Sequence, residues 1–232
     1  MGCRKVAGLK LAESIFYDEI ISCKACPRLV NYRESVPEVK EALNGYWKKP
    51  VPGFGNPRSK IMIIGLAPSA QGGNRTGRVF TGDRSGDFLF EALYRAGYSN
   101  KPFSVNINDG LRVDHAYITA VVKCAPPGNK PTSEEARTCS EKFLKREIEM
   151  INPRVIVVLG SFAYMWTLKT LESLGKKPDK AQKFSHGCKV KADSLTIICS
   201  YHPSPQNTFT KKLTLEMLVK ILNDAKKEAS LQ

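Results

Sequence analysis

Four cysteines in two separated pairs are the residues of this chain best suited to bind a metal. Cys23 and Cys26 form a C-x2-C pair, and Cys124 and Cys139 follow about a hundred residues later. Thiolates are soft ligands, so two distant pairs suit a metal or iron-sulfur centre that joins remote parts of one fold. Iron-sulfur and zinc are both open here, because four thiolates bind either one. Buried, inert cysteines are the structural alternative.

Polar and aromatic residues follow three of the buried apolar runs. The first run leads into G-L-A-P-S-A-Q-G-G-N-R-T-G-R-V-F-T-G-D, which ends at Asp83; the second leads to Asn129 and the last to His202. In open α/β sheets, ligands bind beyond the carboxyl ends of the strands, so these three exits are expected to meet. The glycine-rich exit lacks the phosphate-loop and dinucleotide patterns, so nucleotide binding is only weakly supported.

Four strand-then-helix units are predicted to position these residues. The expected strands are 60–65, 115–122, 154–159 and 195–200, and the expected helices are 8–22, 85–97, 132–151, 161–174 and 213–227. Such units predict an α/β fold with three layers, α/β/α, around a central four-stranded parallel sheet. We expect one domain over 1–232, with an N-terminal arm of about 1–58 packed on the core.

Composition narrows the partners and the compartment. Thirty-six Lys and Arg against 22 Asp and Glu give a net charge of +14, which favours a polyanion such as nucleic acid. No apolar stretch has the length of a membrane span, and no secretory signal precedes the core, so we expect a cytoplasmic protein. Seven cysteines, an odd number, argue against a disulfide framework.

The ordered strand-end motifs resemble those of the uracil-DNA glycosylase superfamily, and most closely family 5, the iron-sulfur-containing type B enzymes of thermophiles. The chain carries G-L-A-P, G-R-V-F-T-G, K-C-A-P-P-G-N-K-P and H-P-S in that order, within roughly residues 20 to 220. Family 4 has an acidic residue and an Asn where this chain has Leu66 and Ala120. The resemblance implies a [4Fe-4S] cluster on the four cysteines, with zinc as the physical alternative.

The resemblance and the chemistry of base release together suggest site roles. Phe80 is expected to stack on a base flipped out of the duplex, and His202 to donate to the base oxygen that gains charge. Asp83 is expected to hold the attacking water, with Asp87 as the alternative, and Asn129 to bond base or water. Further base-binding and DNA-binding positions are expected at Ala67, Ser69, Ala70, Ser204, Asn207, Lys211 and Lys212.

The implied activity is that of a monofunctional DNA glycosylase of base excision repair. It would hydrolyse uracil from double-stranded DNA, and from single-stranded DNA, and leave an abasic site without strand cleavage. Hypoxanthine, xanthine or mismatched thymine are alternative substrates, because Ala120 lacks the side chain that selects uracil in the related branch. A catalytically inactive, basic iron-sulfur protein that binds nucleic acid is the other alternative. We expect a monomer with no membrane contact, associated with the nucleoid of a prokaryotic cell.

Overall fold

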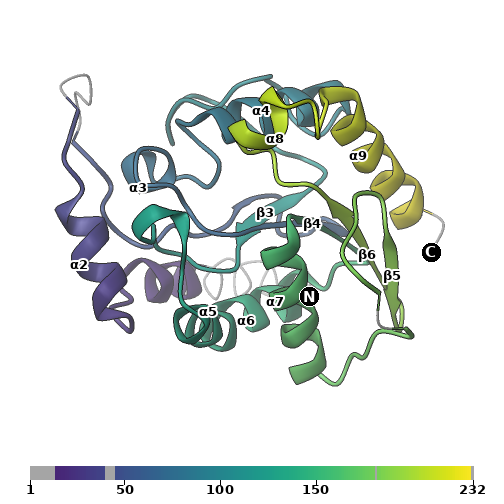
Figure 1. The fold of residues 1–232 in the computed structure, drawn as a ribbon. Coiled ribbons are helices and arrows are strands. Elements are labelled where there is room, and N and C mark those ends of the chain that lie inside the picture. The colour runs from purple at the N-terminus through teal and green to yellow at the C-terminus, as the bar shows by residue number, and fades with distance from the viewer. Residues whose placement is uncertain (1–13, 40–44, 181, 231–232) are drawn as a thin grey trace, which may run out of the picture.

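The computed structural model describes residues 14–39, 45–180 and 182–230 (Figure 1). Its strands are β1 (Phe54–Gly55), β2 (Ile61–Gly65), β3 (Tyr117–Ala120), β4 (Val155–Leu159), β5 (Lys189–Ala192) and β6 (Leu195–Ser200). Its helices are α2 (Pro27–Ser35), α3 (Gly73–Thr76), α4 (Arg84–Arg95), α5 (Ser133–Cys139), α6 (Lys145–Ile151), α7 (Ser161–Ser173), α8 (Pro205–Phe209) and α9 (Leu215–Ser230). A 3-10 turn spans Pro127–Asn129, and a π-helical turn spans Ser140–Leu144.

The predicted strands form the centre of a wider sheet. The strand order is β1-β3-β2-β4-β6-β5, in which β3, β2, β4 and β6 are parallel and the two edge strands are antiparallel. The α/β class is confirmed, but the sheet is mixed and has six strands rather than four. The edge strands were not predicted, because β1 has two residues in a Pro/Gly-rich stretch and β5 lies in a lysine-rich one. In β5 the lysines point outward and alternate with buried Val190 and Ala192.

Two helical layers cover the two faces of the sheet, as Figure 1 shows. On one face Ile61 and Ile63 pack with α4 and α9, whereas Met62 and Ile64 face the opposite core under the α5 to α7 segment. Alternate residues of a strand point to opposite faces, so the fully apolar strand β2 needs a cover on both sides. The predicted three-layer arrangement is confirmed.

The N-terminal segment joins the core beside α5. Residues 14–21 are helical, as predicted for 8–22, and residues 8–13 of that prediction lie outside the described part of the chain. Phe16, Ile20 and Leu29 are buried in the core on the α5 to α7 side. Helix α2, which was not predicted, is held by Arg28, whose guanidinium donates to both carboxylate oxygens of Glu135 at 2.7 Å. The segment therefore packs on the sheet's second strand-helix unit.

Candidate active site and thiol pocket

The rings of Phe80 and His202 meet at the carboxyl edge of the sheet. Their centroids are 6.1 Å apart, although Phe80 follows β2 and His202 follows β6. Phe80 has a positive φ of 53° and its ring lies against Gly65, where a Cβ atom would come within 2.4 Å of the ring. Gly160, at the end of β4, leaves similar space for His202. Small residues at the strand ends therefore let the two rings approach each other.

Asp83 is fixed at both carboxylate oxygens. One oxygen accepts a hydrogen bond from the backbone N–H of Gly86 at 2.9 Å and so caps helix α4, and the other accepts from the hydroxyl of Ser69. Gly72 is needed beside this pair, since a Cβ atom there would overlap both side chains. Asp87, the alternative carboxylate, is exposed on the first turn of α4. Of the two carboxylates, Asp83 is the less exposed, and its negative charge favours the protonated form of His202.

Burial lowers the pKa of His202 to about 4, and the nearby Asp83 carboxylate only partly offsets this effect. The imidazole is therefore neutral at neutral pH and has one N–H to donate. A neutral donor close to an aromatic face and a carboxylate suits a reaction in which an anion develops on a flat ring and a cation or water lies beside it.

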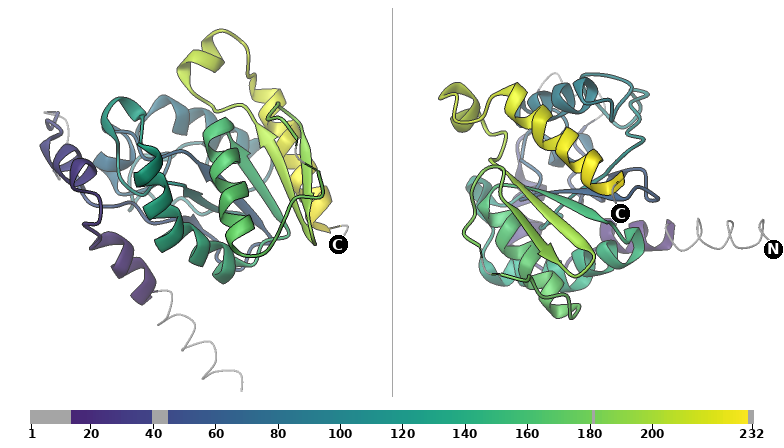
Figure 2. Two further views of the ribbon diagram at one scale, coloured as in Figure 1. Left: turned by 60° about the horizontal axis from the view of Figure 1, so that its bottom comes forward. Right: turned by 90° about the vertical axis from the view of Figure 1, so that its right-hand side faces the viewer.

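Beyond His202 the chain turns outward through α8, which stands clear of the sheet in both views of Figure 2. Ser204 is the N-cap residue of this helix, and Asn207 closes the turn by donating to the carbonyl of His202 at 2.8 Å. Lys211 and Lys212 are exposed just after the helix. The turn thus presents two cations at the rim of the site.

Phe209, at the end of α8, is the most exposed large apolar side chain of the described residues, with 67% of its surface accessible. The guanidinium of Arg84 lies 5.2 Å from its ring centroid. An aromatic ring beside a cation is a surface on which a nucleic-acid base can stack. Phe209 was not among the predicted site residues, because an isolated Phe in a polar segment carries no signal of its exposure.

The other predicted site residues lie at the same edge of the sheet with fewer contacts. Asn129 is exposed in the 3-10 turn after β3, and no hydrogen bond among the described residues joins it to Phe80, Asp83 or His202. Ala67 and Ala70 are partly buried in the loop after β2. Their roles toward a ligand stay predictions.

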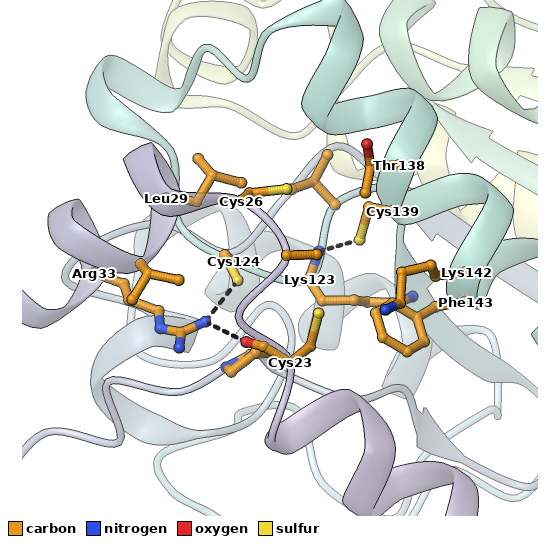
Figure 3. Close-up of a pocket in the computed structure, with 14 residues that line it drawn as sticks. Cys23, Cys26, Leu29, Arg33, Lys123, Cys124, Thr138, Cys139, Lys142 and Phe143 are labelled. Carbon is orange, nitrogen blue, oxygen red and sulfur yellow. Dashed lines mark hydrogen bonds between the residues drawn. The ribbon is translucent and has the colours of Figure 1, made fainter.

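The four predicted ligand cysteines line one pocket, together with Arg33 and Lys142 (Figure 3). Their sulfur atoms point toward a shared space from the N-terminal turn, the end of β3 and helix α5. Two N–H groups donate to the sulfurs: the guanidinium of Arg33 to Cys124 at 3.0 Å and the amide of Lys123 to Cys139 at 3.3 Å. The π-helical turn begins at the residue after Cys139.

Burial raises the pKa of Cys124 to about 11 and that of Cys139 to about 12. Thiols of this kind become thiolates when they bind a metal, which supplies the compensating positive charge. Four sulfur ligands therefore fit an iron-sulfur cluster. By their chemical type they also suit zinc. Within residues 14–39, 45–180 and 182–230, no three His, Cys, Asp or Glu side chains are grouped closely enough to hold a single metal ion.

A buried ion pair involves Lys123, one of the residues that line the thiol pocket. Lys123 Nζ is 2.6 Å from Glu147, and their side chains are 1% and 0% exposed. Glu147 also accepts from the hydroxyls of Tyr117 at 3.1 Å and Thr119 at 3.0 Å. Lys123 and Arg33 were missed at the sequence level, because nothing in a single sequence distinguishes a buried cation from the many solvated ones of a basic protein.

Known proteins similar to this chain include uracil-DNA glycosylases of type 5 and type 4. Residues 52–226 match the family model described as the uracil DNA glycosylase superfamily. The chain is 45% identical over 215 residues to a type-5 uracil-DNA glycosylase of Pyrobaculum aerophilum, covering 92% of each chain. It is 44% identical over 220 residues to that of Thermus thermophilus, covering 93% of this chain and 98% of the relative. A type-4 uracil-DNA glycosylase of Archaeoglobus fulgidus is 33% identical over 192 residues, covering 80% and 78%. None of the described helices has the length and apolarity that crossing a membrane requires.

Proposed function

Because this chain belongs to the uracil DNA glycosylase superfamily, and within it to the type-5 enzymes, we propose that it excises uracil from DNA and leaves an abasic site. The observation that carries the proposal is the meeting of Phe80, His202 and Asp83, which reach one edge of the sheet from two separate strands. The aromatic face can bind the flat base, the neutral donor can stabilise the anion that develops on it, and the held carboxylate can orient water for hydrolysis of the N-glycosidic bond.

The chemical step uses these groups in turn. The uracil nucleotide leaves the base stack, at a cost on the order of a few kcal/mol, and its ring stacks on Phe80. The bond between the sugar C1′ and the base N1 breaks, and its electron pair stays on the base. The N–H of His202 donates to the base oxygen that carries this charge. Asp83 orients a water molecule, which adds its oxygen to C1′ and gives up a proton to the carboxylate.

The α8 turn supplies contacts to the rest of the duplex. Lys211, Lys212 and Ser204 would bind phosphates beside the extruded nucleotide. Phe209 projects beyond them, where its ring can contact the bases that the extruded nucleotide leaves behind. The net charge of +14 adds an attraction to DNA that weakens as salt rises.

We also propose a [4Fe-4S] cluster bound by Cys23, Cys26, Cys124 and Cys139. Four cysteines that line one pocket would supply the thiolate ligands of such a cluster, and the N–H donors of Arg33 and Lys123 would hydrogen-bond to the ligand sulfurs and so tune its potential. When bound, the cluster would tie the N-terminal segment to β3 and α5, and it would supply no group that touches the reacting atoms. A brown protein with four irons per chain is expected after anaerobic purification; a colourless, zinc-loaded protein would contradict the cluster.

A duplex assay tests the activity. The purified holoprotein is incubated with duplexes that carry uracil, hypoxanthine, xanthine or a mismatched thymine, and abasic sites are revealed by alkaline cleavage. We expect release of uracil, and without alkali no strand cleavage. Activity on hypoxanthine or xanthine would extend the substrate range, as Ala120 leads us to propose. No release of any base, with DNA binding unchanged in His202→Gln, would instead support an inactive binding protein.

The proposal extends to the oligomeric state, the domain organisation, the DNA substrate and the location of the enzyme. We infer that it works as a monomer, with residues 1–232 acting as one domain, on uracil in double-stranded and single-stranded DNA at the nucleoid. Sedimentation of the holoprotein with and without a uracil-free duplex would test the monomer, and single-stranded uracil oligonucleotides in the excision assay would test the second substrate.

A further inference from the structure

A continuous series of hydrogen bonds joins the thiol pocket to Asp83. At the pocket, the guanidinium of Arg33 donates to the sulfur of Cys124 and, at 3.3 Å, to the carbonyl of Cys23 (Figure 3). The backbone carbonyl of Arg33 accepts a hydrogen bond from the side-chain amide of Asn74 at 3.1 Å. Asn74 lies in α3, the short helix within the glycine-rich loop after β2.

From Asn74 the series continues to the active site. Its backbone N–H donates to the carbonyl of Ser69 at 3.1 Å, and the hydroxyl of Ser69 donates to Asp83. Gly72, the N-cap residue of α3, lies against this pair, since a Cβ atom there would come within 2.3 Å of the Asp83 carboxylate and 2.4 Å of the Ser69 hydroxyl. The position of α3 therefore contributes, together with the bond from Gly86, to the position of the carboxylate.

The two side chains of this series on α2 and α3 are sealed from solvent: that of Asn74 reaches the α2 backbone, and that of Arg33 reaches the thiol pocket. Arg33 is 3% exposed and Asn74 is 0% exposed. Each also has a buried polar atom without a hydrogen-bond partner among the described residues, Nε of Arg33 and Oδ1 of Asn74. Leaving such atoms unsatisfied costs stability. The carbonyl of Arg33 lies in the last turn of α2, where carbonyls lack partners within the helix, and Asn74 supplies its donor.

We propose that Asn74 is a positioning residue that couples the group bound in the thiol pocket to the catalytic carboxylate Asp83. The proposal rests on the bound cluster and the base-excision activity proposed above. With the cluster held by Cys124, Arg33 is fixed, α2 presents its carbonyl to Asn74, and α3 holds Ser69 against Asp83. Coupling between two sites is reciprocal, so DNA bound at Asp83 must in turn stabilise the bound metal.

Protection of the metal by DNA provides a readout that does not depend on activity. The holoprotein is mixed with a chelator, and iron release is followed by absorbance, with and without a saturating duplex that carries a tetrahydrofuran abasic-site analogue. If the pocket holds zinc, a zinc-sensitive dye follows the same release. We expect the duplex to slow metal release by about fivefold or more in the parent protein, within the usual range of coupling between sites.

The variants cut the series at two different bonds. Asn74→Ala removes the bond to Arg33 but keeps the backbone bonds of Lys48 to Asn74 and of Trp47 to Arg75, which anchor α3. Arg33→Met removes the bond to Cys124 and leaves Asn74 intact. Each is expected to abolish the protection by DNA, and the double variant to behave like either single one. Since protection is a ratio within one protein, a general loss of stability does not imitate this result.

Ser104→Ala is the matched control. Ser104 is also buried, and its hydroxyl bonds to Arg78 and Thr81 on the other side of the same loop without touching α2. It should retain the protection. Protection that survives in both Asn74→Ala and Arg33→Met, or that is missing in the parent protein while the duplex is bound, would overturn the proposal, as would a pocket that holds no metal. A protein that shows the coupling but releases no uracil would refute the proposed activity alone.

Discussion

Ser69 donates its hydroxyl hydrogen bond to the one oxygen of Asp83 that does not cap helix α4. The carboxylate is therefore held by its own helix on one side and by the loop after β2 on the other. Because Asp83 serves both as a helix cap and as the proposed water-orienting group, a substitution must separate these two roles before either one can be assigned.

Asp83→Asn makes this separation. Asparagine caps helices about as well as aspartate, so the free energy of unfolding should change by less than about 1 kcal/mol. The rate of uracil release should fall by about 10²- to 10⁴-fold, since the general base is lost. Single-turnover rates and urea unfolding measure the two effects. Asp87→Asn is the control and should retain most of the activity; the reverse ranking would assign the water to Asp87.

Contact between Gly65 and Phe80 gives a second prediction. In Gly65→Ala the new methyl group would lie 2.4 Å from the tip of the Phe80 ring, so the ring must move off the strand end. We expect the loss of base stacking, worth about 1 to 3 kcal/mol, to slow uracil release by about 5- to 150-fold. Phe80→Leu should cause a similar loss, and the two losses should not add in the double variant. Full additivity would show that Gly65→Ala slows release by a route other than displacement of the Phe80 ring.

Phe209 is expected to contribute to DNA binding rather than to bond cleavage. Phe209→Ala should weaken binding to a uracil-free duplex or an abasic one by about 1 to 3 kcal/mol, with the single-turnover rate at saturating protein changed little. Phe209→Trp keeps an aromatic face and should restore affinity. Fluorescence anisotropy at fixed salt measures the affinity, and equal binding by the Ala and Trp variants would exclude a stacking role.

The sequence predicts the centre of this fold better than its edges, for physical reasons. Strands β2 and β4 are buried on both faces, so their apolar runs are unambiguous, whereas β1 and β5 gain their strand conformation only from neighbours. Helix α2 buries only Leu29 and Arg33 of its own residues, and it depends on Glu135, a hundred residues away. The strand-end motifs gave Phe80, Asp83 and His202, since parallel strands must bring their ends together. The hydrogen bond from Asn74 to the carbonyl of Arg33 joins residues 41 positions apart in the chain, so no local sequence pattern predicts it.

The pKa of His202 predicts a specific pH dependence of stability. The folded protein keeps this imidazole neutral down to about pH 4, whereas in the unfolded chain it takes up a proton near its ordinary pKa of 6.5. The unfolded state thus binds more protons between these values, and the free energy of unfolding falls as the pH is lowered from about 6.5 to about 4. One proton contributes at most about 1.4 kcal/mol per pH unit.

The comparison with His202→Gln isolates this contribution. Glutamine does not titrate, so the variant should lose stability less steeply over the same pH interval. Urea unfolding followed by tryptophan fluorescence at several pH values provides the curves, and any acid sensitivity of the thiol pocket is common to both proteins. Curves that fall in parallel would mean that His202 takes up its proton with a similar pKa in both states.

The buried pair of Lys123 and Glu147 should be the most sensitive ion pair described here. Glu147→Gln leaves the ammonium group without its counter-charge, at a cost of about 3 to 5 kcal/mol, whereas Lys123→Met with Glu147→Leu removes both charges and should cost less. Arg95→Gln, which breaks the solvent-accessible pair with Glu91, should cost under about 1 kcal/mol. Urea unfolding of the holoproteins checks the ranking. If Glu147→Gln is as mild as Arg95→Gln, the counter-charge of Glu147 does not stabilise the buried Lys123 as proposed.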